Sequence, residues 1–191
     1  MKKSRKLILC TTLLCAVSAL VYLTRYYLLF KEREKRYDQI IQTVALRHNV
    51  PSSLVKAVIY RESKFQEHIR GRHGEYGLMQ ITTLAADDWI RERRKTVFKN
   101  YDQLFTPELN IEIGTWYLAK GLIKYRDYKH KNALTLAHYN AGPGNVRKNK
   151  WVPSHKDGEV LKLITFPSTK GYIKDILEHE QEYKKQGLSH E

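Results

Sequence analysis

Glu62 is the residue whose type and setting best suit acid–base chemistry. It follows Leu54 and Val58 at steps of four, so it continues an apolar helix face, and it lies near the C-terminal end of that helix. Burial and the negative end of the helix dipole both disfavour an ionised carboxyl group, so we expect a raised pKa. A carboxyl group that stays protonated near neutral pH can act as a general acid. A Glu that pairs with Arg61 or Lys64 at a frayed helix end fits the same position.

Further short motifs follow Glu62 in a fixed order. The set is Glu62-Ser63-Lys64-Phe65, Gly74-Glu75-Tyr76-Gly77-Leu78-Met79-Gln80-Ile81, Ala137-His138-Tyr139-Asn140-Ala141-Gly142-Pro143-Gly144 and Pro167-Ser168-Thr169-Lys170-Gly171-Tyr172. Together these motifs resemble the catalytic domain of the soluble-type (family 1) lytic transglycosylases, which have a goose-lysozyme-like helical fold. Thr106-Pro107-Glu108, Asn110, Gly114 and Tyr117-Leu118 resemble the helix after the second motif of that family. The resemblance covers about residues 37–180.

The resemblance implies that Glu62 is the sole catalytic carboxylate of a peptidoglycan lytic transglycosylase. As an acid it protonates the oxygen between N-acetylmuramic acid and N-acetylglucosamine. As a base it then activates the muramoyl sugar's own carbon-six hydroxyl, which closes onto the anomeric carbon and leaves a 1,6-anhydromuramoyl end. One carboxylate suffices because the nucleophile lies within the substrate, whereas ordinary glycosidases use two.

The resemblance also implies five substrate-binding residues. They are Met79, Gln80, Tyr139, Asn140 and Tyr172. The first two line the groove next to Glu62, the second two face it from the other side, and Tyr172 lies close to the acid. Sugar faces stack on aromatic rings, and side-chain amides donate to and accept from hydroxyl and acetamido groups. Met79 fits a core position equally well, and a solvent-facing or packed His138 fits better than one that tunes Glu62.

The sequence departs from the common pattern of the family at four positions. Gly71 stands where a Ser is frequent, Glu75 replaces a small residue, and Thr83 replaces a frequent Pro. Ser168 stands where an acidic residue commonly precedes Thr-x-x-Tyr, which removes one candidate stabiliser of positive charge. Either the activity is weaker for this reason or Glu75 partly substitutes.

Two other functions stay open. A hydrolytic muramidase of the lysozyme type needs a second carboxylate or a held water opposite Glu62, and the acidic residues nearby in sequence are Glu75, Asp87 and Asp88. A non-catalytic cell-wall-binding protein of the same fold is the other alternative, and the intact motif residues argue against it.

The elements that position these residues are predicted to be helices. The predicted ranges are about 36–48, a helix capped by Ser52 that carries Glu62, one after Thr82-Thr83, one from Thr106-Pro107-Glu108 to about 125, one over about 131–140 that stops at Gly142-Pro143-Gly144, and one from about Thr169. Apart from a possible short hairpin near 70–80, no alternation of apolar and polar residues at period two, which would indicate a strand, is evident. We therefore predict an all-α domain of the lysozyme-like superfamily with a glycan groove.

The N-terminal segment is predicted to be a membrane anchor or a signal sequence. The run from Leu7 to Thr24 carries no charge and nearly matches a bilayer core of roughly 30 Å. Lys and Arg residues just before it favour a cytoplasmic N-terminus. We expect a single-pass protein of a bacterial inner membrane with its catalytic domain in the periplasm, or a secreted protein if the signal is cleaved. The predicted parts are 1–30, a charged linker at 31–36, the domain at 37–185 and a tail at 186–191.

Composition limits the partners. The 191 residues include 34 Lys and Arg against 20 Asp and Glu, a net charge of +14. Such a charge fits anionic partners; we expect peptidoglycan strands and a membrane, and no nucleic acid because no recognition motif is present. Cys10 and Cys15 lie in the apolar run, which excludes a disulfide scaffold and a Cys zinc site elsewhere. No metal or cofactor is expected, and we expect a monomer.

Overall fold

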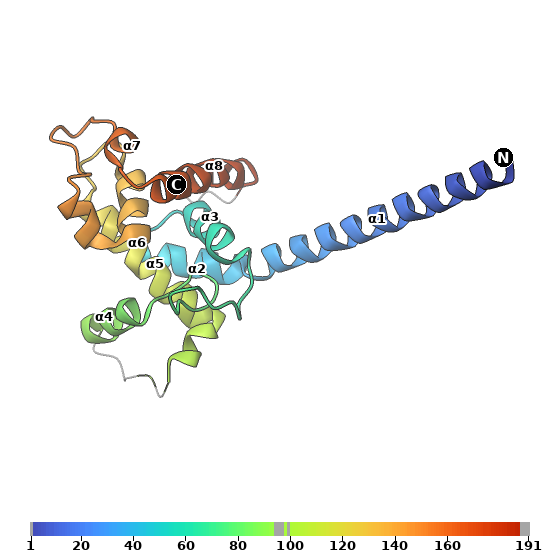
Figure 1. Cartoon of the computed structure of the whole chain (residues 1–191). Coiled ribbons are helices and arrows are strands. Elements are labelled where there is room, and N and C mark those ends of the chain that lie inside the picture. Colours follow the sequence, from blue (N-terminus) through green and yellow to red (C-terminus); the bar gives the residue numbers. More distant parts are fainter. Residues whose placement is uncertain (1, 94–97, 99, 188–191) are drawn as a thin grey trace. The chain divides into compact units, whose positions relative to one another are not determined.

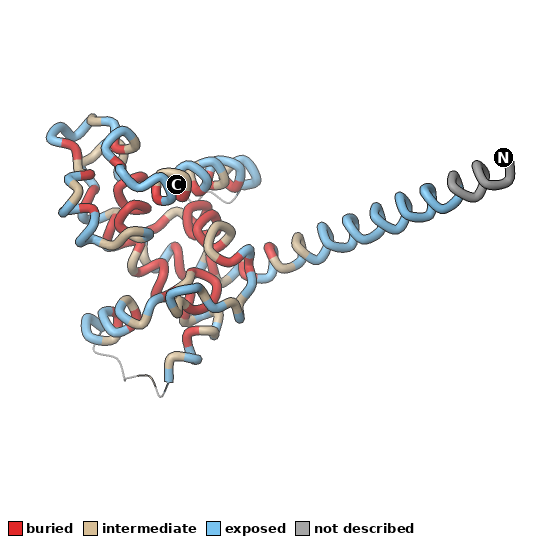
Figure 2. The backbone as a smooth tube through the Cα atoms, viewed as in Figure 1, coloured by how far each residue is buried: buried red, intermediate tan, exposed pale blue. Residues whose placement is uncertain are grey.

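The computed structural model describes residues 2–93, 98 and 100–187. It divides into two units, Met1–Arg36 and Tyr37–Glu191. The first unit is a single helix, α1 (Lys2–Arg36), labelled in Figure 1. Its side chains from residue 10 to residue 29 are exposed, as the pale blue tube in Figure 2 shows. Among the described residues, this apolar stretch is the one long enough and apolar enough to cross a membrane.

The charged residues 31–36 form the last turns of α1 rather than a separate linker. Lys, Glu and Arg are good helix formers. Lys31 and Glu34 also form an ion pair of 2.6 Å at the i,i+3 spacing that brings side chains together on a helix. The segment is thus helical, and the division of the chain into two units falls directly after it, between Arg36 and Tyr37.

The second unit is built from helices. The elements are α2 (Asp38–His48), α3 (Ser52–Ser63), α4 (Thr83–Arg93), the 3-10 helix η1 (Tyr101–Phe105), α5 (Pro107–Lys124), α6 (Lys131–Lys148), α7 (Val160–Leu163) and α8 (Pro167–Lys185). The prediction of an all-α domain is confirmed. The hairpin considered near 70–80 is reduced to two isolated antiparallel bridges, Arg70 with Tyr76 and Tyr76 with Ile81.

The core lies around α5, which contacts α2, α4 and α6, while α8 packs against α3 and α6. Figure 2 shows the buried positions of these helices meeting in the interior of the domain. Ile111, Ile113 and Leu118 of α5 are fully buried on different sides of the helix. A helix that is apolar on most of its circumference belongs in the centre of a domain. It therefore provides a rigid base for the segments on either side of it.

The helix α6 consists of two helical stretches that meet at a kink at Gly142, where the backbone is not helical. Gly142 has φ 78° and ψ 155°, and the helix continues through Pro143 to Lys148. Gly adopts positive φ without steric cost, and Pro next to it has no N–H to donate, so the chain bends at this pair and then resumes. The first helical stretch therefore stops at Gly142, as predicted, and a second helical stretch that was not predicted follows it directly. Residues 188–191 of the predicted tail lie outside the described residues.

Candidate active site

Glu62 lies in the last turn of α3, where the chain reverses sharply. Lys64 and Phe65 have φ values of 51° and 61°, and the Lys64 N–H bonds to the Tyr60 carbonyl at 3.1 Å. Such a left-handed residue ends a helix and satisfies one of its free carbonyls. The Phe65 ring, 1 % exposed, fixes the reversal in the core. Glu62 itself remains partly exposed at the helix end.

The carboxyl group of Glu62 is held by Tyr172 of α8. The Tyr172 hydroxyl donates a hydrogen bond of 2.6 Å to Glu62 Oε1. Burial raises the pKa of Glu62 from 4.5 to about 7, and the negative charge of Glu75 adds to the rise. The hydrogen bond from Tyr172 and the positive charge of Arg61 act in the opposite direction. A pKa near 7 lets one carboxyl group both give and take a proton at neutral pH.

Arg61 does not neutralise Glu62 through an ion pair in this structure. Its Nε bonds to Asp175 Oδ2 at 3.1 Å, and its guanidinium lies 5.5 Å from the centre of the Tyr172 ring. The simple alternative of a Glu paired with its neighbouring Arg therefore does not describe the arrangement. Arg61 instead stabilises the ring that bonds to the acid.

Residues 77–80 form a tight loop next to Glu62, and Asn110 of α5 holds it. Asn110 is fully buried. Its Oδ1 accepts from the Met79 N–H at 2.7 Å, and its Nδ2 donates to the carbonyls of Tyr76 and Leu104 at 2.8 and 2.6 Å. Gly77, at φ 68°, leaves no room for a Cβ, which would lie 2.7 Å from Asn110 Nδ2. Sequence reasoning noted Asn110 only as part of a motif and missed this role.

The Met79 side chain faces the core and not the groove, which corrects the prediction that it contacts substrate. Met79 is 0 % exposed. It packs directly against Gly114 of α5, where an added Cβ would lie 2.8 Å from Met79 Cε. Its carbonyl oxygen instead accepts a hydrogen bond of 2.8 Å from the Tyr139 hydroxyl. Met79 therefore ties the loop to α5 and α6.

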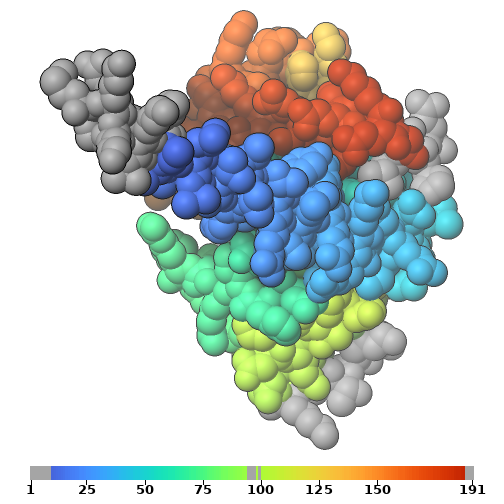
Figure 3. Space-filling model, turned by 90° about the vertical axis from the view of Figure 1, so that its right-hand side faces the viewer, coloured from blue at the N-terminus to red at the C-terminus, as the bar shows by residue number. Residues whose placement is uncertain are grey.

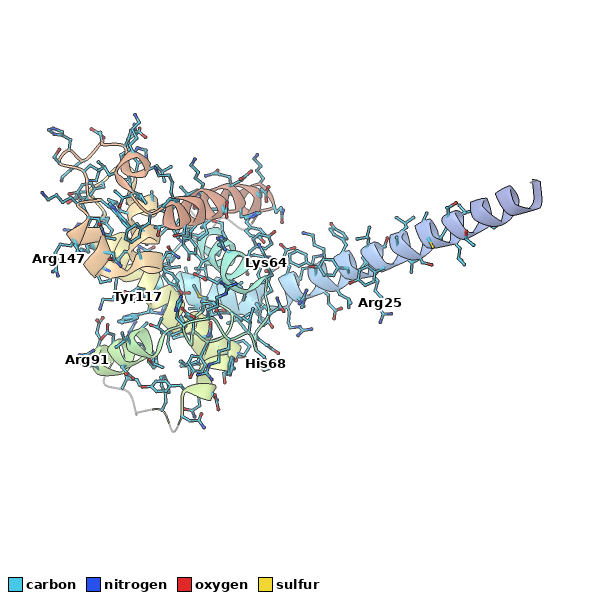
Figure 4. The ribbon with its side chains drawn as sticks, in the orientation of Figure 1. Arg25, Lys64, His68, Arg91, Tyr117 and Arg147 are labelled. Carbon is cyan, nitrogen blue, oxygen red and sulfur yellow. The ribbon has the colours of Figure 1, made fainter. Side chains whose placement is uncertain are left out.

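A groove of about 440 Å³ lies beside this loop, between α4, α5 and α6. Its lining includes Gln80, Tyr139 and Asn140, three of the predicted substrate-binding residues, together with Tyr117. Figure 4 shows Tyr117 on α5 between α4 and α6. The Tyr117 and Tyr139 rings meet edge to face, with centroids 5.7 Å apart. Aromatic rings and amides around one hollow are suited to sugar binding.

Two other cavities, of about 550 and 640 Å³, are larger but carry none of the predicted site residues. The smaller groove is therefore the candidate binding site, because its lining holds the chemistry. Glu62 is not among its lining residues. Figure 3 shows that the segment between α3 and α4 (green) and α8 (red) reach the same face of the domain.

Tyr172 is buried, 3 % exposed, and its hydroxyl bonds to Glu62. Its predicted place close to the acid is confirmed, and its role as a substrate contact stays a prediction. Asn140 keeps an exposed position, and its Oδ1 accepts from the Thr169 hydroxyl at 2.8 Å. That bond leaves the Asn140 amide N–H groups for a ligand in the groove. It also joins the third motif to the fourth.

His138 is packed in the core. Its ring meets those of Tyr117 and Tyr125 edge to face, at 5.5 and 6.0 Å. Burial lowers its pKa from 6.5 to about 4, and the nearby Lys124 and Lys120 add to the decrease. The ring is therefore neutral at physiological pH and supports the wall of the groove. No group of three or more His, Cys, Asp or Glu within residues 2–93, 98 and 100–187 could hold a metal ion.

The comparison with known proteins decides the family. Residues 39–161 match the family model of the transglycosylase SLT domain. The chain belongs to this family. The soluble lytic murein transglycosylase of Escherichia coli K12 is 29% identical over 153 residues, which cover 78% of this chain and 23% of that protein. The membrane-bound lytic murein transglycosylase E of Buchnera aphidicola is 30% identical over 155 residues, which cover 81% of this chain and 70% of that protein.

Solved structures agree. An inactive mutant of the lytic transglycosylase Slt from Pseudomonas aeruginosa gives a TM-score of 0.70 at 25% identity, covering 81% of this chain and 25% of that one. The 70 kDa soluble lytic transglycosylase of Escherichia coli gives 0.68 at 26% identity, covering 80% and 25%. This SLT domain chain thus spans about a quarter of the length of these soluble relatives. The resemblance of its motifs to the soluble-type family is confirmed.

Proposed function

We propose that this chain is a peptidoglycan lytic transglycosylase and that Glu62 performs both of its proton transfers. The observation that carries the proposal is the Glu62 carboxyl group, which burial keeps protonated up to about pH 7 and which the Tyr172 hydroxyl holds at 2.6 Å. Membership of the SLT domain family and the names of the relatives support the same activity.

The proposed reaction has two steps. Neutral Glu62 first donates its proton to the oxygen that links N-acetylmuramic acid to N-acetylglucosamine, and that bond breaks. The Glu62 carboxylate that forms is stabilised by the Tyr172 hydroxyl and by the positive charge of Arg61. It then takes the proton from the carbon-six hydroxyl of the muramoyl sugar as that oxygen bonds to the anomeric carbon. Gln80, Tyr139, Asn140 and Tyr117 hold the glycan in the groove.

The test is digestion of purified sacculi by the full chain in detergent, with mass spectrometry of the released muropeptides. Wild type should release products with 1,6-anhydromuramoyl ends. Glu62→Gln keeps the size of the side chain but cannot protonate an oxygen, so the rate should fall by at least about 10²–10⁴-fold. The control is Glu92→Gln, which changes an exposed Glu that pairs with Lys120 and does not line the groove. This variant should keep wild-type activity. Anhydro release by folded Glu62→Gln at the wild-type rate would overturn the assignment.

We also propose that α1 is a single-pass anchor in a bacterial inner membrane, with the catalytic domain in the periplasm. The exposed apolar side chains of α1 and the basic residues before them support this topology. The full chain should sediment with membranes after an alkaline wash, and the domain should be cleaved by protease in spheroplasts. A variant without residues 1–36 should remain in the supernatant. A mature protein that starts after Ala19 and is free in solution would contradict the anchor.

A further inference from the structure

Arg61 of α3 and Asp175 of α8 form an ion pair beside the Tyr172 ring. Arg61 Nε donates to Asp175 Oδ2 at 3.1 Å, and the two residues are 114 positions apart in the chain. The guanidinium carbon of Arg61 lies 5.5 Å from the centre of the Tyr172 ring. Helices α3 and α8, labelled in Figure 1, pack against each other. The pair therefore joins the helix that carries the acid to the helix that carries its hydrogen-bond partner.

The position of the Arg61 guanidinium matters to Glu62, which is the next residue of the chain. Consecutive residues of a helix point about 100° apart, yet both side chains reach Tyr172, Arg61 at the ring and Glu62 at the hydroxyl. A guanidinium does not lose its charge in proteins. Its effect on the acid therefore depends on where it is held and on which negative charge balances it.

The stability of the domain does not explain the pair. The Arg61 side chain is 39% exposed and that of Asp175 is 52% exposed. Ion pairs at such exposed positions stabilise a fold only slightly, and both helices already contribute fully buried apolar residues, such as Val58 and Ile176. The pair thus adds little to folding, but it decides where the guanidinium lies.

Other titratable groups around the acid and the pair have partners of their own. These groups are Lys64, which follows α3, Glu75 between α3 and α4, Tyr139 of α6, and His179, one turn beyond Asp175 on α8. Their respective partners are the Tyr60 ring, the His73 N–H, the Met79 carbonyl and the Glu182 carboxylate. Asp175 is the carboxylate that bonds to Arg61 and fixes its guanidinium.

We propose that Asp175 is a positioning residue, which holds the Arg61 guanidinium against the Tyr172 ring and away from the Glu62 carboxyl group. The inference rests on the proposed function and deepens it. Without the Asp175 carboxylate, Arg61 is free to turn toward Glu62, and its charge is no longer balanced. A positive charge close to a carboxyl group favours the ionised form. Glu62 would then lose its proton at a lower pH and could no longer serve as the acid at neutral pH.

The test is a pH–rate profile of sacculus digestion by the full chain in detergent. Asp175→Asn should move the decline of activity to lower pH by about 0.5 unit, the size of effect that an exposed charge pair can exert. With the pKa of Glu62 at about 7, the rate at pH 7.5 should fall about threefold, and the rate at pH 5.5 should hardly change. Asp175→Glu keeps the charge and should keep the wild-type profile.

A second pair of variants shows whether Asp175 acts through Arg61. Arg61→Gln removes the positive charge and should move the decline to higher pH, opposite to Asp175→Asn. The double variant Arg61→Gln, Asp175→Asn should match Arg61→Gln alone, because Asp175 then has no guanidinium to hold. The matched control is Asp127→Asn, since Asp127 is an exposed Asp that pairs with Lys156 and Arg126. It should leave the profile unchanged.

Carbon NMR of labelled Glu side chains measures the titration of Glu62 without turnover, and Glu62→Gln identifies the signal. The titration should move by the same amount and in the same direction as the activity. This inference is overturned if neither Asp175→Asn nor Arg61→Gln moves it, or if Asp175→Asn still moves it in the Arg61→Gln background; the proposed function then stands. The absence of any cleavage by wild type overturns the proposed function itself, and the NMR titration still decides the role of Asp175.

Discussion

The Tyr172 hydroxyl donates a hydrogen bond of 2.6 Å to Oε1 of Glu62, which joins two residues 110 positions apart in the chain. The bond favours the ionised carboxylate, whereas burial favours the neutral acid. These effects oppose each other and leave the pKa of Glu62 at about 7. A group with that pKa can donate a proton in one step and accept one in the next at neutral pH.

Tyr172→Phe tests this balance. Loss of the hydroxyl removes a hydrogen bond to the carboxylate that forms as Glu62 gives up its proton, worth about 1.5–3 kcal/mol for a charged group. The value of kcat should therefore fall by about 10- to 100-fold. Because the acid must be protonated, wild-type activity should decline above about pH 7. The decline of the variant should move to higher pH, since its carboxylate is less stable. A pH–rate profile measures both.

The matched control is Tyr125→Phe. The Tyr125 hydroxyl lies 3.4 Å from His138 Nδ1, so its partner is His138 and not Glu62. This variant loses a buried hydroxyl of the same kind, so it should keep the pH at which wild-type activity declines. A decline at unchanged pH in Tyr172→Phe would show that the bond to Glu62 does not set the pKa.

The raised pKa of Glu62 also makes stability depend on pH. Between about pH 4.5 and 7 the folded protein keeps a proton that the unfolded chain releases, so the free energy of unfolding falls as pH rises through this window. Glu62→Gln has no such titration. It should be more stable than wild type by about 1–3 kcal/mol above pH 7, and the two should converge below pH 4.5. Urea unfolding at several pH values measures the difference, and a constant difference would contradict the raised pKa.

The fold could be predicted because the helices carry local signals. The motif Thr106-Pro107-Glu108 predicts the start of a helix, and α5 does begin at Pro107. Boundaries that depend on the surroundings could not be predicted in this way. Gly142 and Pro143 have the local chemistry of a helix stop, and the first helical stretch of α6 does stop at Gly142, but a second stretch resumes directly after it. The second stretch forms because Val146, which lies beyond the kink, is buried in the core. The local sequence does not reveal such packing.

The sequence predicted which residues belong to the candidate site, but not the role that each of them has. The motifs brought Glu62 and Tyr172 together, and the structure joins them directly. Sequence reasoning assigned Met79 and Tyr172 to the substrate because both lie in motifs, whereas both are buried. Their burial depends on distant partners, Gly114 for Met79 and α3 for Tyr172. Tyr117, which lines the groove, had only its place in a family-like helix as a signal.

Asn110→Ala tests the connection between α5 and the loop at residues 77–80. The substitution leaves the Met79 N–H and the Leu104 carbonyl without their buried partner, while the Tyr76 carbonyl keeps the hydrogen bond from the Ile81 N–H. An unsatisfied buried group costs about 1–3 kcal/mol, so the variant should lose about 3 kcal/mol or more of its free energy of unfolding, together with activity at temperatures where it remains folded. Asn145→Ala removes an exposed Asn that bonds to Ala141 and should change stability by less than about 0.5 kcal/mol. Similar losses in both variants would contradict a specific role for Asn110.

Gly114→Ala and Gly171→Ala form a matched pair on two helices. A Cβ on Gly114 would lie 2.8 Å from Met79 Cε and 2.9 Å from Met79 Cβ, whereas nothing lies within 4 Å of a Cβ on Gly171.

Gly114→Ala should therefore destabilise the domain by about 1–3 kcal/mol through overpacking, and it should lower activity because the backbone of Met79, bonded to Asn110 and Tyr139, must shift. Gly171→Ala should stabilise α8 by about 0.5–1 kcal/mol, because Ala costs less backbone entropy in a helix than Gly. Thermal unfolding and sacculus digestion compare the two variants with wild type. Stabilisation by Gly114→Ala with full activity would show that Met79 can move without disturbing the loop at residues 77–80. In that case the contact between Gly114 and Met79 would not be needed to hold Gln80 beside the groove.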